Sequence, residues 1–424
     1  MTKRPYFWVF LFSVFAARSP VGLPAQAIDY RTEESPCISW NGVPLHDARL
    51  LALAGISAMA SPAFALSAHP GLIPGPHGLN AGITFGGANH ESYQYWGVNQ
   101  GVVQELDGVS GDVFRCSGLA ASLRLEPITF SAGWFMGARL EFPSFHFLQE
   151  FTQESWSYSG EFDGVENDFF LALAGRWGGR LSLGLTWHHV SGHRVVEIDD
   201  TTRFVFGDQW EFNRTRHSES HRLAYERLSL GVRWRFVGSW ILDAAWHQPF
   251  TGEVRRSVVR EFYSSLSGER LTIQSHEYVD DLVRPAKFVL GVSHGSFYPE
   301  DRETGVLGIA LEAVYTFWDE YRYEFFGEDQ SREMRNTVSL AAAAEYGVAV
   351  SSRQLVFRIG YRWDPQPLET PPTVLHGVSG GVGLEFGRFS LGVGVAYHFC
   401  RINGTTQDHL LLAATLNARI GRDQ

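Results

Sequence analysis

The side chains best suited to chemistry in this chain are arginines set at alternate positions of apolar segments. A guanidinium is planar and can bind a carboxylate through two hydrogen bonds, so these arginines could hold the head of an amphiphilic ligand. The same arginines could instead form a ladder of ion pairs with Asp243, Glu312, Asp364 and Glu385. The candidate ligand-binding arginines are Arg176, Arg233, Arg235, Arg358 and Arg362.

Residues for catalysis or metal binding do not assemble into a site. Residues 377–381 read G-V-S-G-G, which fits G-x-S-x-G, but strands are predicted to follow them and not the required helix. His188 and His189 are adjacent, and neighbouring residues of a strand point to opposite faces. We therefore predict no catalytic residue, no metal and no cofactor. Three cysteines have no spacing that predicts a disulfide, and they are Cys37, Cys116 and Cys400.

The arginines lie in segments with a period of two, which is typical of strands. In residues 180–188, leucines and Trp187 alternate with Ser182, Gly184 and Thr186. Fourteen such segments can be counted, at 78–91, 114–126, 128–142, 166–177, 180–198, 221–236, 239–260, 282–296, 304–320, 335–349, 353–364, 377–387, 388–400 and 407–420. The pattern predicts an all-β fold, an antiparallel barrel of about 14 strands over residues 78–424.

The two faces of these strands indicate a barrel in a membrane. The apolar face often ends in an aromatic residue such as Trp187, Trp234 or Trp363, as an interfacial girdle requires. Bare charges on the other face would be costly in a dry core and are tolerable in a hydrated lumen. The net charge of −11 argues against a nucleic-acid partner. Polar segments are predicted as loops at 143–165, 199–220, 261–281 and 321–334, and 261–281 does not fit a strict alternation of short turns and long loops.

The N-terminus indicates export. Lys3 and Arg4 precede an apolar run over residues 6–17, and Ala25-Gln26-Ala27 is a cleavage site. We therefore predict a signal peptide over residues 1–27. Residues 48–66 are rich in alanine, which suits a segment packed inside something; a membrane helix, which needs about 20 apolar residues, is the alternative.

Four segments of the chain resemble, in order, the FadL/TodX family of outer-membrane transporters of long-chain fatty acids and other hydrophobic compounds. Residues 47–73 resemble the family's plug, and AEYGV, FRIGYRWDPQPL, GVGLEF and GVGVAYHF resemble its last strands. The plug motif is His69-Pro70-Gly71 where the family has Asn-Pro-Ala. The four segments are 47–73, 228–252, 284–318 and 344–399.

The resemblance implies a plug over residues 28–77 inside the barrel and a hydrophobic small molecule as ligand. Its tail would contact apolar plug residues, for which Phe64, Leu66, Leu72 and Ile73 are candidates. The third strand, 128–142, would be kinked and open a side exit to the bilayer; it lies between Pro127 and Pro143 and contains Gly133 and Gly137.

The resemblance also implies a monomer in the outer membrane of a Gram-negative-type cell, in contact with its lipids. The Asp-Ala-Arg sequence at 47–49 is similar to a related branch, the PorV-type barrels, which serve protein secretion. A partner-binding component of secretion or surface attachment is therefore the alternative function.

Overall fold

The computed structural model describes most of the chain beyond residue 46. The described residues are 47–73, 78–91, 95–99, 102–107, 109–111, 115–139, 142–150, 154–206, 209–265, 268, 270–274, 278–295, 307–325, 328–329, 334–367, 373–402 and 405–420. The predicted signal peptide and Cys37 lie outside these residues.

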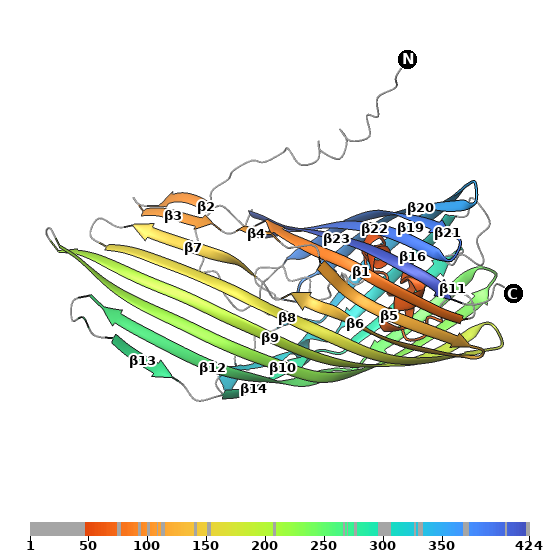
Figure 1. Cartoon of the computed structure of the whole chain (residues 1–424), viewed down its shortest axis with the longest axis horizontal. Helices are drawn as coiled ribbons and strands as arrows, with labels where there is room; N and C mark the ends of the chain where they lie inside the picture. Colours follow the sequence, from red (N-terminus) through yellow and green to blue (C-terminus); the bar gives the residue numbers. More distant parts are fainter. Residues whose placement is uncertain are drawn as a thin grey trace, which may run out of the picture.

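Fourteen antiparallel wall strands close into a barrel (Figure 1). The first strand pairs with the last from Leu79↔Ile420 to His90↔His409. In chain order the wall strands are β1 (Gly78–Glu91), β5 (Arg115–Leu125), β6 (Ile128–Arg139), β8 (Glu154–Trp177), β9 (Leu181–Phe206), β10 (Gln209–Val237), β11 (Trp240–His247) continued by β12 (Phe250–Ser264), β14 (Tyr278–Arg284) continued by β15 (Lys287–His294), β16 (Leu307–Thr316), β19 (Thr337–Val350), β20 (Arg353–Pro365), β21 (Val374–Phe386), β22 (Phe389–Ile402) and β23 (Thr405–Ile420). Each predicted strand overlaps one wall strand, so the predicted fold class is confirmed.

The prediction of loops at the four polar segments is partly wrong. Strands β8, β9, β10 and β12 continue into three of these segments, 143–165, 199–220 and 261–281, and Figure 1 shows them extending far past the other wall strands. Polar residues can pair in a ladder where both faces meet water, so polarity alone did not mark a loop. Counted from 1 to 14 in chain order, the wall strands before the four segments are the third, fifth, seventh and ninth. Alternate strands of an antiparallel barrel end on the same side, so all four segments lie at one end of the barrel. Segment 261–281 therefore fits the alternation of short turns and long loops. Shorter strands between β1 and β5 are β2 (Tyr95–Asn99), β3 (Val102–Asp107) and β4 (Val109–Gly111). Those at the polar segments are β7 (Phe142–Glu150), β13 (Arg270–Gln274), β17 (Arg322–Phe325) and β18 (Glu328–Asp329).

Burial along the wall is the reverse of that in a water-soluble protein. Large apolar side chains point outward and are exposed, with Leu171 at 56% and Ile359 at 62%. Their neighbours in sequence point inward and are small or polar, and Thr84 and Thr186 are fully buried. An apolar outer surface with a polar interior is the arrangement of a barrel seated in lipid.

Residues 47–73 fill the barrel interior near the end with the short turns (Figure 1), and we call them the plug. Pro62, Pro70 and Gly55 interrupt the chain, so only short helical turns form. These are α2 (Ala48–Ala52), η3 (Ser57–Met59), η4 (Pro62–Phe64) and α3 (Ala65–Ala68), and η6 (Trp318–Glu320) lies elsewhere. No helix among the described residues is long and apolar enough to cross a membrane. The predicted limits of the plug at 28 and 77 fall outside the described residues.

Candidate functional site: the plug and the interior above it

The motif His69-Pro70-Gly71 rests on two glycines of the wall. Gly184 of β9 and Gly231 of β10 are paired across the ladder. A Cβ atom at Gly184 would lie 1.8 Å from the carbonyl oxygen of Pro70, and one at Gly231 would lie 2.5 Å from the nitrogen of Gly71. Only glycine therefore lets the plug backbone approach the wall so closely.

A second glycine pair supports helix α2. Gly381 of β21 and Gly394 of β22 are paired, and a Cβ atom at Gly394 would lie 2.2 Å from the carbonyl oxygen of Ala48. The serine of the G-V-S-G-G segment belongs to this contact. Ser379 Oγ accepts a hydrogen bond from Ala54 N and donates one to Ala52 O, each at 3.0 Å. The segment that fits a hydrolase motif is thus a seat for the plug.

Wall hydroxyls hold the backbone of the plug at several other points. Short helices leave many peptide groups without an internal partner. Thr186 Oγ1 donates to Leu66 O at 2.7 Å, and Ser182 Oγ donates to Gly71 O at 2.8 Å. On another part of the wall, Thr415 Oγ1 accepts from Ala48 N at 2.8 Å. The plug is therefore hydrogen-bonded to widely separated strands.

Asp47 organises the plug internally. Its carboxylate accepts from Arg49 N at 2.9 Å, from Ser61 N at 2.6 Å and from Ser61 Oγ at 2.8 Å. It thereby caps α2 and ties it to the turn before η4. Burial raises the pKa of Asp47 above its ordinary value, and these hydrogen bonds oppose that rise.

One buried carboxylate links the plug to the wall by charge. Glu345 Oε1 of β19 lies 3.1 Å from Arg49 Nη2, and Glu345 Oε2 lies 2.6 Å from Arg358 Nε of β20. The three side chains are 7% exposed or less. One of the five arginines predicted to bind ligand, Arg358, therefore bonds the acid that also holds the plug.

The other predicted arginines are spread along the interior face. Arg233 Nε lies 3.4 Å from Asp243 Oδ1. Arg362 Nε lies 4.0 Å from Asp364 Oδ2, and its Nη1 donates to Ala54 O at 3.4 Å. Arg176 and Arg235 lie near the short turns. The structure does not gather the five into one site, and their role in ligand binding stays a prediction. Arg233 and Arg362 each lie beside an acid of the predicted ion-pair ladder, Asp243 and Asp364 respectively.

Three of the four apolar plug candidates form one cluster against the wall. Phe64, Leu66 and Ile73 pack with Phe135 and Phe170 and with alanines of β5 and β8. The fourth, Leu72, packs inside the plug with Leu50, Ala60 and Ala65. All four are buried.

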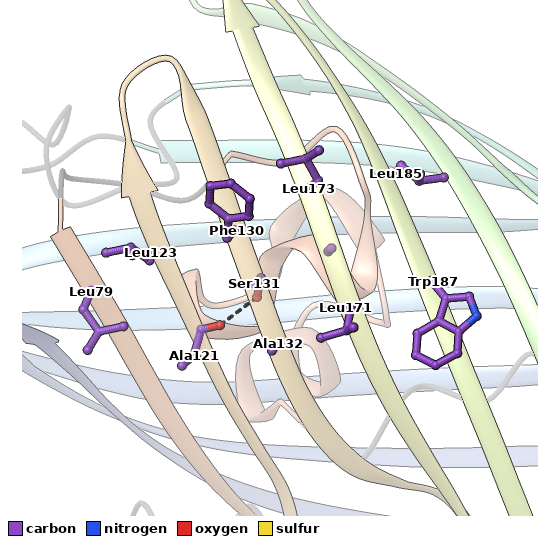
Figure 2. Close-up of a pocket in the computed structure, with 11 residues that line it drawn as sticks. Leu79, Ala121, Leu123, Phe130, Ser131, Ala132, Leu171, Leu173, Leu185 and Trp187 are labelled. Carbon is purple, nitrogen blue, oxygen red and sulfur yellow. Dashed lines mark hydrogen bonds between the residues drawn. The ribbon is translucent and has the colours of Figure 1, made fainter.

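The outer surface of the same strands carries an apolar groove of about 470 Å³. Figure 2 shows it across β1, β5, β6, β8 and β9, with plug helices behind the wall. Its floor is formed by small residues such as Ala121 and Ala132, between Leu123, Phe130 and Leu171. The wall is thus thin where the buried plug cluster lies inside it and the groove outside it.

The third wall strand is irregular next to this groove. The register of β6 against β8 shifts between Met136 and Ala138, at Gly137, which agrees with the predicted interruption. Its pairing with β5 extends only to Gly118↔Phe135. The strand itself ends at Arg139 and not at 142, and Pro143 belongs to β7, so the predicted boundary was wrong.

The sequence reasoning missed a set of ionisable residues above the plug, towards the end with the long strands. His188 Nδ1 lies 3.0 Å from Asp168 Oδ1, and Arg227 Nη2 lies 3.5 Å from Asp168 Oδ2. Lys287 of β15 is paired across the ladder with His247 and shares its face. Among the described residues, no ion pair or hydrogen bond involves the ammonium group of Lys287, whose backbone pairs with His247 and Thr316. We call Asp168, His188, Arg227, His247 and Lys287 the cationic layer. The alternation of Lys287 with Phe288 and Leu290 was the signal that could have found it.

His69 makes the plug contact sensitive to acid. Its Nδ1 accepts from Gly71 N–H at 3.2 Å, which requires an unprotonated nitrogen. Burial lowers the pKa of His69 below the ordinary 6.5, and the Asp243 carboxylate opposes this. Its contribution to stability is therefore present above pH 6.5 and is lost as the pH falls below that value. We expect a lower thermal midpoint at pH 5 than at pH 7.5 in calorimetry, with a smaller difference in His69→Asn. An equal difference in both proteins would contradict this assignment.

Known proteins resemble this chain in fold and hardly in sequence. Neither a protein-family profile nor a curated protein sequence matches the chain. Among solved structures, the monoaromatic hydrocarbon channel CymD matches with a TM-score of 0.56 and 12% identity, over 89% of this chain and 98% of its own. A FadL homologue of Pseudomonas aeruginosa matches with a TM-score of 0.55 and 12% identity over the same shares.

The toluene transporter TbuX of Ralstonia pickettii also matches, with a TM-score of 0.55 and 12% identity, over 90% of this chain and 100% of its own. These identities are low, while the matches cover nearly all of each barrel. The resemblance that the sequence predicted is therefore confirmed in the architecture: this chain has the fold of the FadL homologues and hydrocarbon channels.

Proposed function

We propose that this protein is an outer-membrane transporter that binds hydrophobic small molecules and passes them through a plugged barrel, with release sideways into the bilayer. The observation that carries the proposal is a closed wall with an apolar exterior around an interior filled by residues 47–73. A water-filled pore would not suit an apolar solute, because such a solute leaves water only for apolar surroundings. A plug with an apolar cluster against a thin part of the wall offers such surroundings.

The structural neighbours support transport over the secretion alternative. Their names describe a monoaromatic hydrocarbon channel, a FadL homologue and a toluene transporter. The outward band of leucine, valine and aromatic side chains fits the hydrocarbon layer of a membrane, and the predicted export signal fits an outer membrane. The proposed path runs from the cationic layer, past the plug cluster of Phe64, Leu66 and Ile73, to the outer groove beside β6.

The cationic layer favours an amphiphile with an anionic head, such as a long-chain carboxylate, over a neutral hydrocarbon. Lys287 and Arg227 both face the interior, and the Asp168 carboxylate lies 3.5 Å from Arg227 Nη2. A charged head on a long apolar tail would complement these cations and the apolar cluster below them. Neutral hydrocarbons could use the apolar contacts only.

Replacing Lys287 by methionine tests this preference. A hydrogen bond to a charged group is worth about 1.5–3 kcal/mol, so we expect Lys287→Met to lower the uptake of labelled oleate by about tenfold at limiting concentration. Uptake of toluene should be unchanged, because toluene has no head to bind. Both are measured with purified protein in lipid vesicles and in cells.

Arg255→Met is the control, because Arg255 is 57% exposed on the outer side of β12. An equal loss of oleate and toluene uptake in Lys287→Met would contradict the assignment of the head group. No uptake of either compound by wild type, above empty vesicles, would contradict transport itself. A stable complex with a secreted protein would then support the secretion alternative.

A further inference from the structure

An aromatic stack with an arginine lies directly above the cationic layer. The rings of Tyr225 (β10) and Phe250 (β12) are 3.7 Å apart and nearly parallel, with an interplanar angle of 5°. The guanidinium carbon of Arg284 (β14) lies 5.6 Å from the Tyr225 ring centroid and 5.7 Å from that of Phe250. Arg284 Nη1 also donates to Tyr225 Oη at 3.0 Å. Tyr225 and Phe250 are 6% and 8% exposed.

The stack lies where the wall ladder is interrupted. Strand β11 pairs with β15 up to His247↔Lys287, and pairing resumes at Phe250↔Arg284 between β12 and β14. Pro249 and Pro285 lie in this interval. Proline has no N–H to donate, so two neighbouring wall strands lose ladder bonds at the same height. Backbone hydrogen bonds from Gln248 N to Leu228 O and from Phe317 N to Ala286 O still join these two strands to their other neighbours.

The stack comes before the cationic layer for a ligand arriving from the end with the long strands. Tyr225 precedes Arg227 by two residues on β10, which runs away from that end. Phe250 follows His247 by three residues on the adjoining strand, which runs towards it. Arg284 likewise precedes Lys287 by three residues. On three neighbouring strands, the stack therefore lies closer than the cationic layer to the end of the barrel with the long strands.

We propose that Tyr225, Phe250 and Arg284 form a gate that selects ligands by width before they reach the cationic layer. This inference rests on the proposed transport function. The cation contacts both rings and its hydrogen bond fixes the tyrosine, so a ligand that moves along this side of the wall towards Lys287 has to displace these side chains. A linear chain needs only a small displacement of one ring. A branched or polycyclic ligand of the same hydrophobicity must part the whole stack.

Thiol labelling tests the gate without a transported ligand. Position 287 carries the reporter as Lys287→Cys, combined with Cys116→Ser to remove a free thiol. A charged maleimide is added outside intact cells, and its rate of reaction is measured. We expect Phe250→Ala to raise that rate at least tenfold. Phe288→Ala, an outward-facing aromatic next to the reporter, should leave it within twofold. Fast labelling with the stack intact, or no increase in Phe250→Ala, would overturn the gate.

Selectivity is the second measurement, made on vesicles with Lys287 intact. Wild type should take up linear oleate in preference to a polycyclic carboxylate, and Phe250→Ala should raise the polycyclic-to-linear ratio about tenfold. Phe250→Leu keeps an apolar side chain and removes the ring beneath Arg284, so it should raise the ratio even if the alanine variant folds poorly. An unchanged ratio in both variants contradicts the gate. If wild type transports neither compound, the transport function fails and the labelling rates still decide whether the stack closes the interior.

Discussion

Alanine at position 184 is expected to displace the plug from the barrel wall. The new Cβ atom would lie 1.8 Å from the carbonyl oxygen of Pro70, and no side-chain rotation can relieve a clash between two main-chain-linked atoms. Either the motif His69-Pro70-Gly71 moves away or β9 bends, and overpacking of this kind costs about 1–3 kcal/mol or more. The hydrogen bonds from Ser182 and Thr186 would be lost with it. We expect the wall of the barrel to form as in wild type, while the interior, no longer filled by the plug, conducts ions.

Planar-bilayer conductance of purified Gly184→Ala measures the effect, and antibiotic sensitivity of intact cells reports it in vivo. Gly291→Ala is the matched control, because Gly291 also faces the interior and a Cβ atom there meets nothing nearer than 3.5 Å. Conductance should rise severalfold in Gly184→Ala and stay at the wild-type level in Gly291→Ala. The same low conductance in both would show that the plug tolerates displacement at this seat.

Removing the carboxylate of Glu345 is expected to produce the second large effect. Both Arg49 of the plug and Arg358 of the wall bind this carboxylate, and all three side chains are buried. Breaking a buried ion pair from one side costs about 3–5 kcal/mol, because the charge that remains has lost its counter-ion. Glu345→Ala should therefore lower the free energy of unfolding by about that amount, measured by denaturant titration in detergent.

An exposed pair gives the comparison. Glu253 and Arg255 lie 3.4 Å apart with both side chains more than half exposed, where a pair is worth about 0.2–1 kcal/mol. Glu253→Ala should therefore be close to wild type. If Glu345→Ala is no more destabilising than Glu253→Ala, the buried ion pairs of Glu345 do not hold the plug. Replacing Arg49 together with Glu345 should recover part of the loss, since the plug cation is then removed as well.

The wall strands could be predicted from the sequence because lipid imposes a strict rule on every second residue. Leu181, Leu183 and Leu185 had to share one face, and the short turns predicted at Gly178-Gly179 and Val237-Gly238 fixed the connections. The lengths of β8, β9 and β10 could not be predicted in the same way. Beyond the lipid both faces of a strand meet water, so the alternation that marks a strand disappears while the ladder continues.

The candidate site was less predictable, because it depends on register. The arginines were correctly placed on the interior face by parity, yet their partners come from other strands, as with Arg358 and Glu345. Gly184 and Gly231 are far apart in the chain, and their shared role is visible only once β9 and β10 are paired. Lys287 was not predicted as a site residue, because its place beside His247 and Arg227 depends on the pairing of β10, β11 and β15.

The hydroxyl of Thr415 links the first residues of the plug to the contact between the last and the first wall strands. Thr415 lies on the last strand, accepts from Ala48 N, and is 2.8 Å from Thr84 Oγ1 on the first strand. Ala48 therefore bonds to the last strand through the same hydroxyl that contacts the first strand. One hydroxyl therefore takes part both in joining the first strand to the last and in holding helix α2, so a substitution of Thr415 would disturb both contacts.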